Sequence, residues 1–281
     1  MTPTAILFPG QGSLTGDAAE HARAVRPDLV DRACELVGDD PFARAAESTR
    51  YAQPAIFVAS LAGWTEREDE FGDVAAMAGH SLGELSALVA AGALSADDGL
   101  RLVVLRGRLM ADAAAASPDG GMVALLGGTP ERAAELADAH DLMVANDNAP
   151  GQLVLSGDTT AIQELVADAR ANGFKTMLLD VAGAFHSPAI APAEQPFRLA
   201  LEDVKWTEPR APVFSGCTAE PFQDIPRELA RALVSPVRWR EVMAALFAHG
   251  ARNFVDVGPG RVLERLAKRN LAGLEDDVLV H

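Results

Sequence analysis

The run Gly79-His-Ser-Leu-Gly83 has the Gly-x-Ser-x-Gly pattern of a serine nucleophile. A serine hydroxyl is a poor nucleophile and must be held exposed on a strained turn, beside a base and a helix N-terminus. The pattern also arises by chance in loops. Here it gains weight because the apolar run Val74–Ala78 precedes it and the helix-forming run Glu84–Ala91 follows it. The sequence therefore predicts that Ser81 takes up an acyl group as an ester.

A serine nucleophile needs a general base, and histidine is the residue that most often supplies it. The chain has six histidines. His80 adjoins Ser81, and neighbours across a sharp turn usually point apart. His186 lies in the loop Gly183-Ala-Phe-His-Ser-Pro188, where a cleft between two subdomains is expected. We predict His186 as the base, against the alternative of a hydrogen-bonded loop histidine. The other four lie in helical, charge-rich or terminal segments: His21, His140, His249 and His281.

The tetrahedral intermediate of acyl transfer needs hydrogen-bond donors for its oxyanion. The backbone N–H of Leu82 is one candidate, because the residue after the nucleophile supplies a donor in such turns. Gln11 is the other candidate. It lies in a loop of proline and glycine that ends the apolar run Ala5–Phe8, a predicted strand. Gln11 is therefore expected at the carboxyl end of a strand, where α/β folds place their chemistry.

The elements that must position these residues divide the chain in two. Between 118 and 187, short elements follow the order strand, helix, strand, strand, helix, strand, which is that of a ferredoxin-like unit. The predicted strands are Met122–Leu126, Leu142–Ala145, Leu153–Ser156 and Lys175–Val181, and the helices Pro130–Ala139 and Thr159–Ala171. We predict an α/β fold with an α/β-hydrolase-like large subdomain over 1–117 and 188–281. A ferredoxin-like small subdomain is inserted at 118–187.

The large part carries further predicted elements. They are helices at Asp28–Val37 and Gln53–Trp64 and strands at Val213–Ser215 and Asn253–Val257.

Composition excludes several classes of protein. The formal net charge of −16 argues against a nucleic-acid partner, since a phosphate backbone needs a broad basic surface. Two cysteines, Cys34 and Cys217, give neither a disulfide framework nor a metal cluster. No apolar run approaches the roughly 18 residues that span a bilayer, and the start lacks a signal peptide pattern. We expect a cytoplasmic protein without a membrane partner, and a monomer as the default.

Taken together, these residues resemble the malonyl-CoA:acyl carrier protein transacylase family, which includes the acyltransferase domains of polyketide synthases. The resemblance covers essentially the whole chain and rests on blocks in the family's order. They are Phe8-Pro-Gly-Gln-Gly-Ser13, Gln53-Pro-Ala55, Gly79-His-Ser-Leu-Gly-Glu84, Arg106-Gly-Arg-Leu-Met110, Asn146-Asp-Asn-Ala-Pro-Gly-Gln152, Gly183-Ala-Phe-His-Ser-Pro188, Ser235-Pro-Val-Arg-Trp239 and Val257-Gly-Pro-Gly260.

The resemblance implies roles for the residues already singled out. It gives Ser81 as nucleophile and His186 as base, with Gln11 and the Leu82 N–H lining the oxyanion hole. It also implies that Arg106 binds the free carboxylate of a malonyl group, a task for which a planar guanidinium is suited. Without the resemblance, Arg106 would be interpreted as an exposed helix residue.

Three further positions are assigned by the resemblance alone. Phe185 resembles the malonyl-selective pattern, because it occupies the space that an α-methyl group needs, and His80 belongs to the same substrate pocket. One methyl is worth only about 1 to 3 kcal/mol of discrimination. Arg238 is expected to orient the catalytic histidine through its backbone carbonyl. Leu14 departs from the family, which often has Gln there.

The implied reaction moves malonyl from malonyl-CoA to the phosphopantetheine thiol of an acyl carrier protein, in fatty acid or polyketide synthesis, without a metal or redox cofactor. Carrier proteins are usually acidic, so a local basic face is expected to dock them. The candidates are Lys175 and four C-terminal residues at helical spacing, Arg261, Arg265, Lys268 and Arg269. The alternative for the C-terminal four is a solvated helix face.

Three rival functions stay open at this point. The first is a hydrolase of the same fold that cleaves acyl groups from carriers, and Arg106 argues against it. The second is a non-catalytic docking subunit, against which the presence of Ser81, His186 and Gln11 argues. The third is an acyltransferase for a different extender unit.

Overall fold

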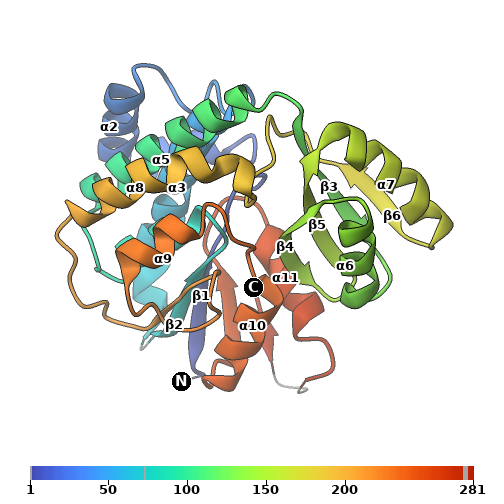
Figure 1. The fold of residues 1–281 in the computed structure, drawn as a ribbon. Helices are drawn as coiled ribbons and strands as arrows, with labels where there is room; N and C mark the ends of the chain where they lie inside the picture. The colour runs from blue at the N-terminus through green and yellow to red at the C-terminus, as the bar shows by residue number, and fades with distance from the viewer. Residues whose placement is uncertain (1, 73, 275–277) are drawn as a thin grey trace.

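A computed structural model describes residues 2–72, 74–274 and 278–281. Its larger sheet is entirely parallel and has the strand order β7-β2-β1-β8-β9. Figure 1 shows β1 and β2 side by side in this sheet. The strands are β1 Thr4–Phe8, β2 Val74–Gly79, β7 Val213–Phe214, β8 Asn253–Asp256 and β9 Leu279–Val280. Every residue of β1 is buried, which explains its unbroken apolar sequence, because a central parallel strand is covered on both faces.

Helices cover both faces of this sheet. On one face, α3 Thr49–Arg67, α4 Gly83–Ala90 and α5 Ala96–Ala116 share a core with Ile6, Phe8 and Met77. On the other, α10 Trp239–Ala248 and α11 Val262–Asn270 pack on Ala5 and Leu7. The remaining helices are α1 Ala18–Val25, α2 Pro27–Val37, α8 Ala191–Glu202 and α9 Ile225–Arg231, with short 3₁₀ turns at Glu68–Glu70 and Pro188–Ile190.

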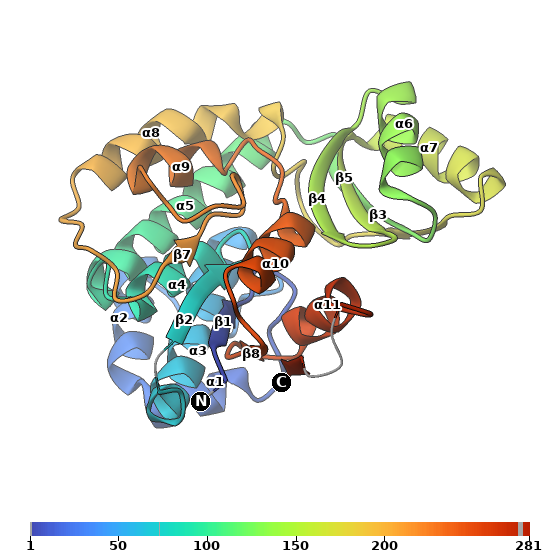
Figure 2. The ribbon, with the colours of Figure 1, turned by 90° about the horizontal axis from the view of Figure 1, so that it is seen from below.

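A second, antiparallel sheet has the order β4-β5-β3-β6. Its strands are β3 Gly120–Leu126, β4 Met143–Ala149, β5 Gln152–Asp158 and β6 Lys175–Leu178. Two helices, α6 Pro130–Ala139 and α7 Thr159–Ala171, lie on its outer side, away from the larger sheet (Figure 2). The chain order β3-α6-β4-β5-α7-β6 with this strand order is the ferredoxin-like topology predicted from the sequence. The exact limits of that subdomain at 118 and 187 stay a prediction.

Strand β4 is longer than the sequence suggested. It was expected to end at Ala145, where the polar run Asn146-Asp-Asn148 begins, but it continues to Ala149. The extension pairs with β5, and the larger part of the chain also holds it. The Asp147 N–H donates to the Val237 carbonyl at 2.9 Å, and the Val237 N–H donates to the Ala145 carbonyl at 2.9 Å. This pairing outweighs the low strand propensity of Asn and Asp.

No helix in the described part of the chain is long and apolar enough to cross a bilayer.

Candidate active site

Ser81 lies on a sharp turn between the end of β2 and the start of α4. Its φ of 54° falls in the left-handed region, which is uncommon and strained for a serine. The turn closes only because its glycines lack side chains. A Cβ on Gly79 would lie 1.9 Å from the Gly83 carbonyl carbon, and a Cβ on Gly83 would lie 2.0 Å from the Phe8 carbonyl oxygen. The strand, turn and helix that the sequence predicted around Ser81 are all present.

His186 meets Ser81 from the segment that follows the small sheet. The Ser81 hydroxyl donates to His186 Nε2 at 2.9 Å, and the His186 Nδ1–H is shared between the carbonyls of Ala232 at 2.9 Å and Ser235 at 3.1 Å. These carbonyls take the place of the carboxylate in a Ser-His-Asp triad and fix the tautomer whose Nε2 accepts a proton. His186 is buried, and burial together with the nearby Arg106 charge lowers its pKa to about 3. The imidazole is therefore neutral and ready to act as a base.

The expectation that the Arg238 carbonyl orients the histidine is wrong. Arg238 is the residue before α10, and its carbonyl accepts the N–H of Val242 at 2.9 Å as the helix begins. Its guanidinium pairs with Glu241 at 2.5 Å. The carbonyl is committed to the helix, so the orienting role falls to Ala232 and Ser235, which precede it in the same loop.

Arg106 is buried, contrary to its interpretation from the helix pattern alone. It projects from α5 with 4% exposure, and its guanidinium donates to Gln53 Oε1 at 2.8 Å and to Ser81 Oγ at 3.1 Å. Both partners are neutral, and among the described residues no carboxylate pairs with it directly. Burial lowers its pKa to about 10, so it is still charged at neutral pH. The site therefore holds a buried cation next to the nucleophile, suited to an anion that arrives from outside.

Gln11 is connected to this cation by a chain of neutral hydrogen bonds. Gln53 Nε2 donates to Thr49 Oγ1 at 2.8 Å, and the Thr49 hydroxyl donates to Gln11 Oε1 at 3.0 Å. Because Oε1 is the acceptor in this bond, the amide nitrogen of Gln11 is left as a donor. Leu82, the N-cap of α4, lines the same cavity as Gln11 and has its N–H at the start of a helix, where such groups lack partners within the helix. The two donors that the sequence predicted thus lie around one cavity.

That cavity has a volume of about 860 Å³ and lies between the large part and the small sheet. Ser81, His186 and Arg106 line it together with Phe185. His80 lines it too, but its ring turns away from the nucleophile: Nε2 donates to Asn148 Oδ1 on β4 at 2.8 Å, and the ring packs on Trp239 at 5.3 Å between centroids. His80 therefore links the Ser81 turn to the small sheet through a hydrogen bond.

Several residues of the site could not be identified from the sequence pattern alone. Thr49 and Gln53 were missed as hydrogen-bonding partners, although Gln53 begins one of the recognised sequence blocks. Ala232 contributes only a carbonyl, which any residue has. Glu84 is a further missed residue. It is 2% exposed, its Oε1 accepts the Gly216 N–H at 2.7 Å, and burial raises its pKa to about 7.

Some of the basic residues that were expected to dock a carrier protein already make contacts within the protein. Arg261 and Lys268 both pair with Glu264, Lys268 at 2.5 Å. Arg269 donates to Gln152 and to the Pro150 carbonyl in the hairpin of the small sheet. Arg265 and Lys175 are exposed. Among the residues that the structure describes, no group of three or more acidic, histidine or cysteine side chains could hold a metal ion, and both cysteines are free and half-buried.

The chain is similar to known acyl transferases over most of its length. Residues 28–279 match the family model of the acyl transferase domain. The chain is 35% identical over 292 residues to the malonyl CoA-acyl carrier protein transacylase of Bacillus subtilis, covering 96% of this chain and 90% of that protein. It is also 38% identical to the polyketide biosynthesis protein ThaF of Burkholderia thailandensis, but spans only 24% of that protein's length.

Solved structures agree in fold over the whole chain. The malonyl-CoA:acyl carrier protein transacylase of Xanthomonas oryzae superposes with a TM-score of 0.89 at 33% identity, covering 100% of this chain and 93% of that one. A malonyl-transacylase in complex with a type II PKS acyl-carrier protein gives a TM-score of 0.86 at 32% identity, covering 96% of this chain and 93% of that one.

The burial of Glu84 predicts how stability varies with pH. Because the folded pKa of about 7 lies above the model value of 4.5, the unfolded chain ionises first as pH rises. The protonated Glu84 side chain therefore stabilises the folded state relative to the unfolded chain. This contribution is fully present below pH 4.5 and is lost as pH rises through 7. The free energy of unfolding of the wild type should therefore decrease between pH 5 and pH 8. In Glu84→Gln we expect this decrease to be smaller by about 3 kcal/mol, as measured by urea titrations at each pH. The exposed control Glu164→Gln should keep the wild-type slope, and an unchanged slope in Glu84→Gln would contradict the assignment.

Proposed function

The chain belongs to the malonyl-CoA:acyl carrier protein transacylase family, and on that premise we propose that it transfers malonyl from malonyl-CoA to the phosphopantetheine thiol of an acyl carrier protein through an ester on Ser81. The observation that carries the proposal is the buried Arg106 guanidinium, which lies 3.1 Å from the Ser81 oxygen and lacks a carboxylate partner in the described part of the chain. A malonyl carboxylate paired there brings the other end of the acyl group to the nucleophile. The transfer serves fatty acid or polyketide synthesis.

The first half-reaction loads the serine. Ser81 Oγ attacks the thioester carbonyl while His186 Nε2, 2.9 Å away, takes its proton. The oxyanion is received by the Gln11 amide and the Leu82 N–H, donors worth about 3 kcal/mol each. The intermediate collapses with cleavage of the carbon–sulfur bond, and His186 returns the proton to the departing coenzyme A thiolate. The product is a malonyl ester on Ser81 and a free thiol.

The second half-reaction repeats these steps in reverse with a different thiol. The phosphopantetheine thiol of the carrier gives its proton to His186 and attacks the ester carbonyl. The carbon–oxygen bond breaks, and the proton passes to Ser81 Oγ. In both half-reactions, every bond change and proton transfer is accounted for by the nucleophile, base, cation and hydrogen-bond donors of the site. The proposal therefore requires no metal or redox cofactor.

Arg106 and Phe185 set the acyl specificity in this proposal. The buried cation favours acyl groups with a free carboxylate, which argues against the rival hydrolase of simple acyl chains. The buried Phe185 ring lines the cavity beside His186 and occupies space that an α-substituent would need. The rival docking subunit would have no use for the strained Ser81 turn or for the hydrogen bond between Ser81 and His186. We also propose that the protein is a cytoplasmic monomer.

Intact-protein mass spectrometry tests the reaction directly. After brief mixing with malonyl-CoA, the wild type should gain one malonyl group, which moves to a holo carrier protein when that is added. Ser81→Ala should gain none. Arg106→Ala should lose about 2 kcal/mol or more of malonyl selectivity over acetyl, the usual cost of removing one partner of a charged pair. Release of free malonate faster than transfer to any carrier would favour the hydrolase instead.

The low pKa of His186 predicts the pH dependence of loading. Because the imidazole has a pKa of about 3 and is already neutral at pH 5, kcat/KM for malonyl-CoA should show no protonation step near 6.5. Burial is the larger cause of this shift and the Arg106 charge the second, so Arg106→Ala should move the acid limb of its residual activity to higher pH. A wild-type limb centred near pH 6.5 would contradict the neutral buried base. The measurement is stopped-flow or quenched loading between pH 3 and 8, so that it includes the acid limb.

Carrier docking is proposed to use the exposed cations Lys175 and Arg265, since the other basic candidates pair with Glu264 or with the small-sheet hairpin. Lys175→Glu and Arg265→Glu should each raise the KM for holo carrier severalfold while leaving loading from malonyl-CoA unchanged, because exposed charges act mainly on encounter. The effect should shrink at high salt. Lys205→Glu, on the loop after α8, serves as a charge-matched control. Unchanged carrier KM in both variants would remove these two residues from the proposal.

A further inference from the structure

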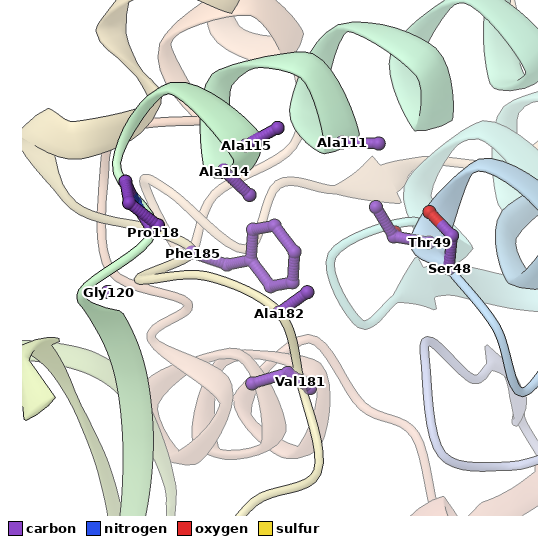
Figure 3. A pocket seen from close by; sticks show the side chains of 10 residues that line it. All are labelled: Ser48, Thr49, Ala111, Ala114, Ala115, Pro118, Gly120, Val181, Ala182 and Phe185. Atoms are coloured by element: carbon purple, nitrogen blue, oxygen red, sulfur yellow. The ribbon is translucent and has the colours of Figure 1, made fainter.

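The side chain of Gln11 is joined to the buried part of the site through the hydroxyl of Thr49, at 3.0 Å. Gln11 lies in an exposed loop after β1, whereas Thr49, the first residue of α3, is 5% exposed. Figure 3 shows Thr49 beside Ser48 at the edge of a pocket whose other side carries Phe185. A glutamine side chain has many rotamers, so the direction of the Gln11 amide depends on what holds it.

Arg106 determines the direction of the hydrogen bonds that end at Gln11. A guanidinium only donates, so the Gln53 atom that lies 2.8 Å from Arg106 has to be the amide oxygen. The Gln53 nitrogen is then turned to Thr49 and donates to its hydroxyl oxygen at 2.8 Å. The Thr49 hydroxyl has a single hydrogen, which it donates to Gln11 Oε1. The order of donors along this chain therefore follows from the chemistry of the arginine.

Burial keeps this order from being exchanged for bonds to water. Gln53 is 1% exposed and Thr49 is 5% exposed, so a reversed amide or hydroxyl would lose its partner inside the protein. If the Gln11 amide were turned by half a rotation, its NH₂ group would meet the Thr49 hydrogen, and two donors would face each other. Gln11 lines the same cavity as Ser81, and with its oxygen held by Thr49 the NH₂ group is the part of the amide left for that cavity.

We propose that Thr49 is a positioning residue, whose hydroxyl holds the Gln11 amide in the orientation that donates to the oxyanion of each tetrahedral intermediate. The inference rests on the proposed function, in which the Gln11 amide and the Leu82 N–H receive that oxyanion. Thr49 acts through Gln11 and touches no reacting atom. Because the oxyanion forms on the carbonyl of any acyl group, Thr49 affects the rate of transfer and not the choice of acyl group.

Two other roles of the hydroxyl lead to different expectations. Thr49 begins α3, and a role in helix stability alone would change the melting temperature while leaving the loading rate unchanged. Thr49 also accepts from Gln53, the partner of Arg106, and a role in placing the guanidinium would change the preference for malonyl over acetyl. The loading rate, the acyl preference and the melting temperature together distinguish the three roles.

The experiment measures single-turnover loading of Ser81 by quenched flow and intact mass, over a range of malonyl-CoA and acetyl-CoA concentrations. Thr49→Val keeps the size of the side chain and removes the hydroxyl. It should lower the saturating loading rate about tenfold, less than the roughly hundredfold loss expected for Gln11→Ala, because the donor stays near but loses its orientation. The concentration for half-maximal loading and the ratio of malonyl to acetyl loading should not change. Transfer from the loaded variant to a holo carrier should slow by the same factor, since an oxyanion forms there too.

Matched variants separate orientation from packing. Thr49→Ser restores the hydroxyl and should recover most of the rate. Thr65→Val is the same substitution near the other end of α3 and should load at the wild-type rate. Adding Thr49→Val to Gln11→Ala should slow loading no further, because the hydroxyl then has no amide to orient. Thermal melts report whether each variant is folded, and Thr49→Ala is the second variant without a hydroxyl if Thr49→Val does not fold.

The inference is overturned if the folded variant without the hydroxyl loads at the wild-type rate, or if Thr49→Ser does not restore loading. It is also overturned if the double variant is slower than Gln11→Ala by the full factor of Thr49→Val, or if the ratio of malonyl to acetyl loading changes. Failure of the wild type to load malonyl is a different result, since it would contradict the proposed function itself.

Discussion

The active site depends on a buried positive charge that the protein does not neutralise by direct contact. Arg106 is enclosed between α3, α5 and the nucleophile turn, and its partners are the amide of Gln53 and the hydroxyl of Ser81. Burial of an unpaired guanidinium costs free energy, visible in the downward shift of its pKa to about 10. In the proposed function, a substrate carboxylate offsets this cost by pairing with Arg106. The acyl specificity that we propose then depends on a buried guanidinium without a carboxylate directly bonded to it in the described part of the chain.

The same charge shapes the acid–base chemistry around it. A histidine beside a buried cation cannot easily become a cation itself, which is the second cause of the low pKa of His186. A triad carboxylate would raise that pKa and would also compete for Arg106. The use of the neutral Ala232 and Ser235 carbonyls avoids both effects while still fixing the imidazole tautomer. The orientation of His186 by the two carbonyls and the proposed binding of a carboxylate by Arg106 therefore depend on the same electrostatic environment.

The sequence predicted what depends on local pattern. The glycines around Ser81, the apolar runs of β1 and β2 and the alternation of elements in the ferredoxin-like part each leave a local signature. His186 was predicted by elimination among few candidates. Features that depend on tertiary placement left no such signature. The helix pattern did not indicate the burial of Arg106, which only the resemblance placed in the site. The continuation of β4 through polar residues was missed, and the assignment of Arg238 was wrong. A backbone carbonyl has no side-chain signature, so nothing in the loop sequence distinguishes Ala232 from Arg238 as the partner of His186.

The small sheet forms one wall of the cavity and also determines where His186 lies. His186 lies on the segment that returns from β6, so the base reaches Ser81 only when the small sheet is correctly placed. That placement is held at the opposite edge, where Asn148 accepts from His80 and Asp147 pairs with Arg240 at 2.7 Å. His80 is the neighbour of the nucleophile, so the turn that strains Ser81 is itself bonded to the inserted sheet. Nucleophile and base are thus aligned through one inserted unit.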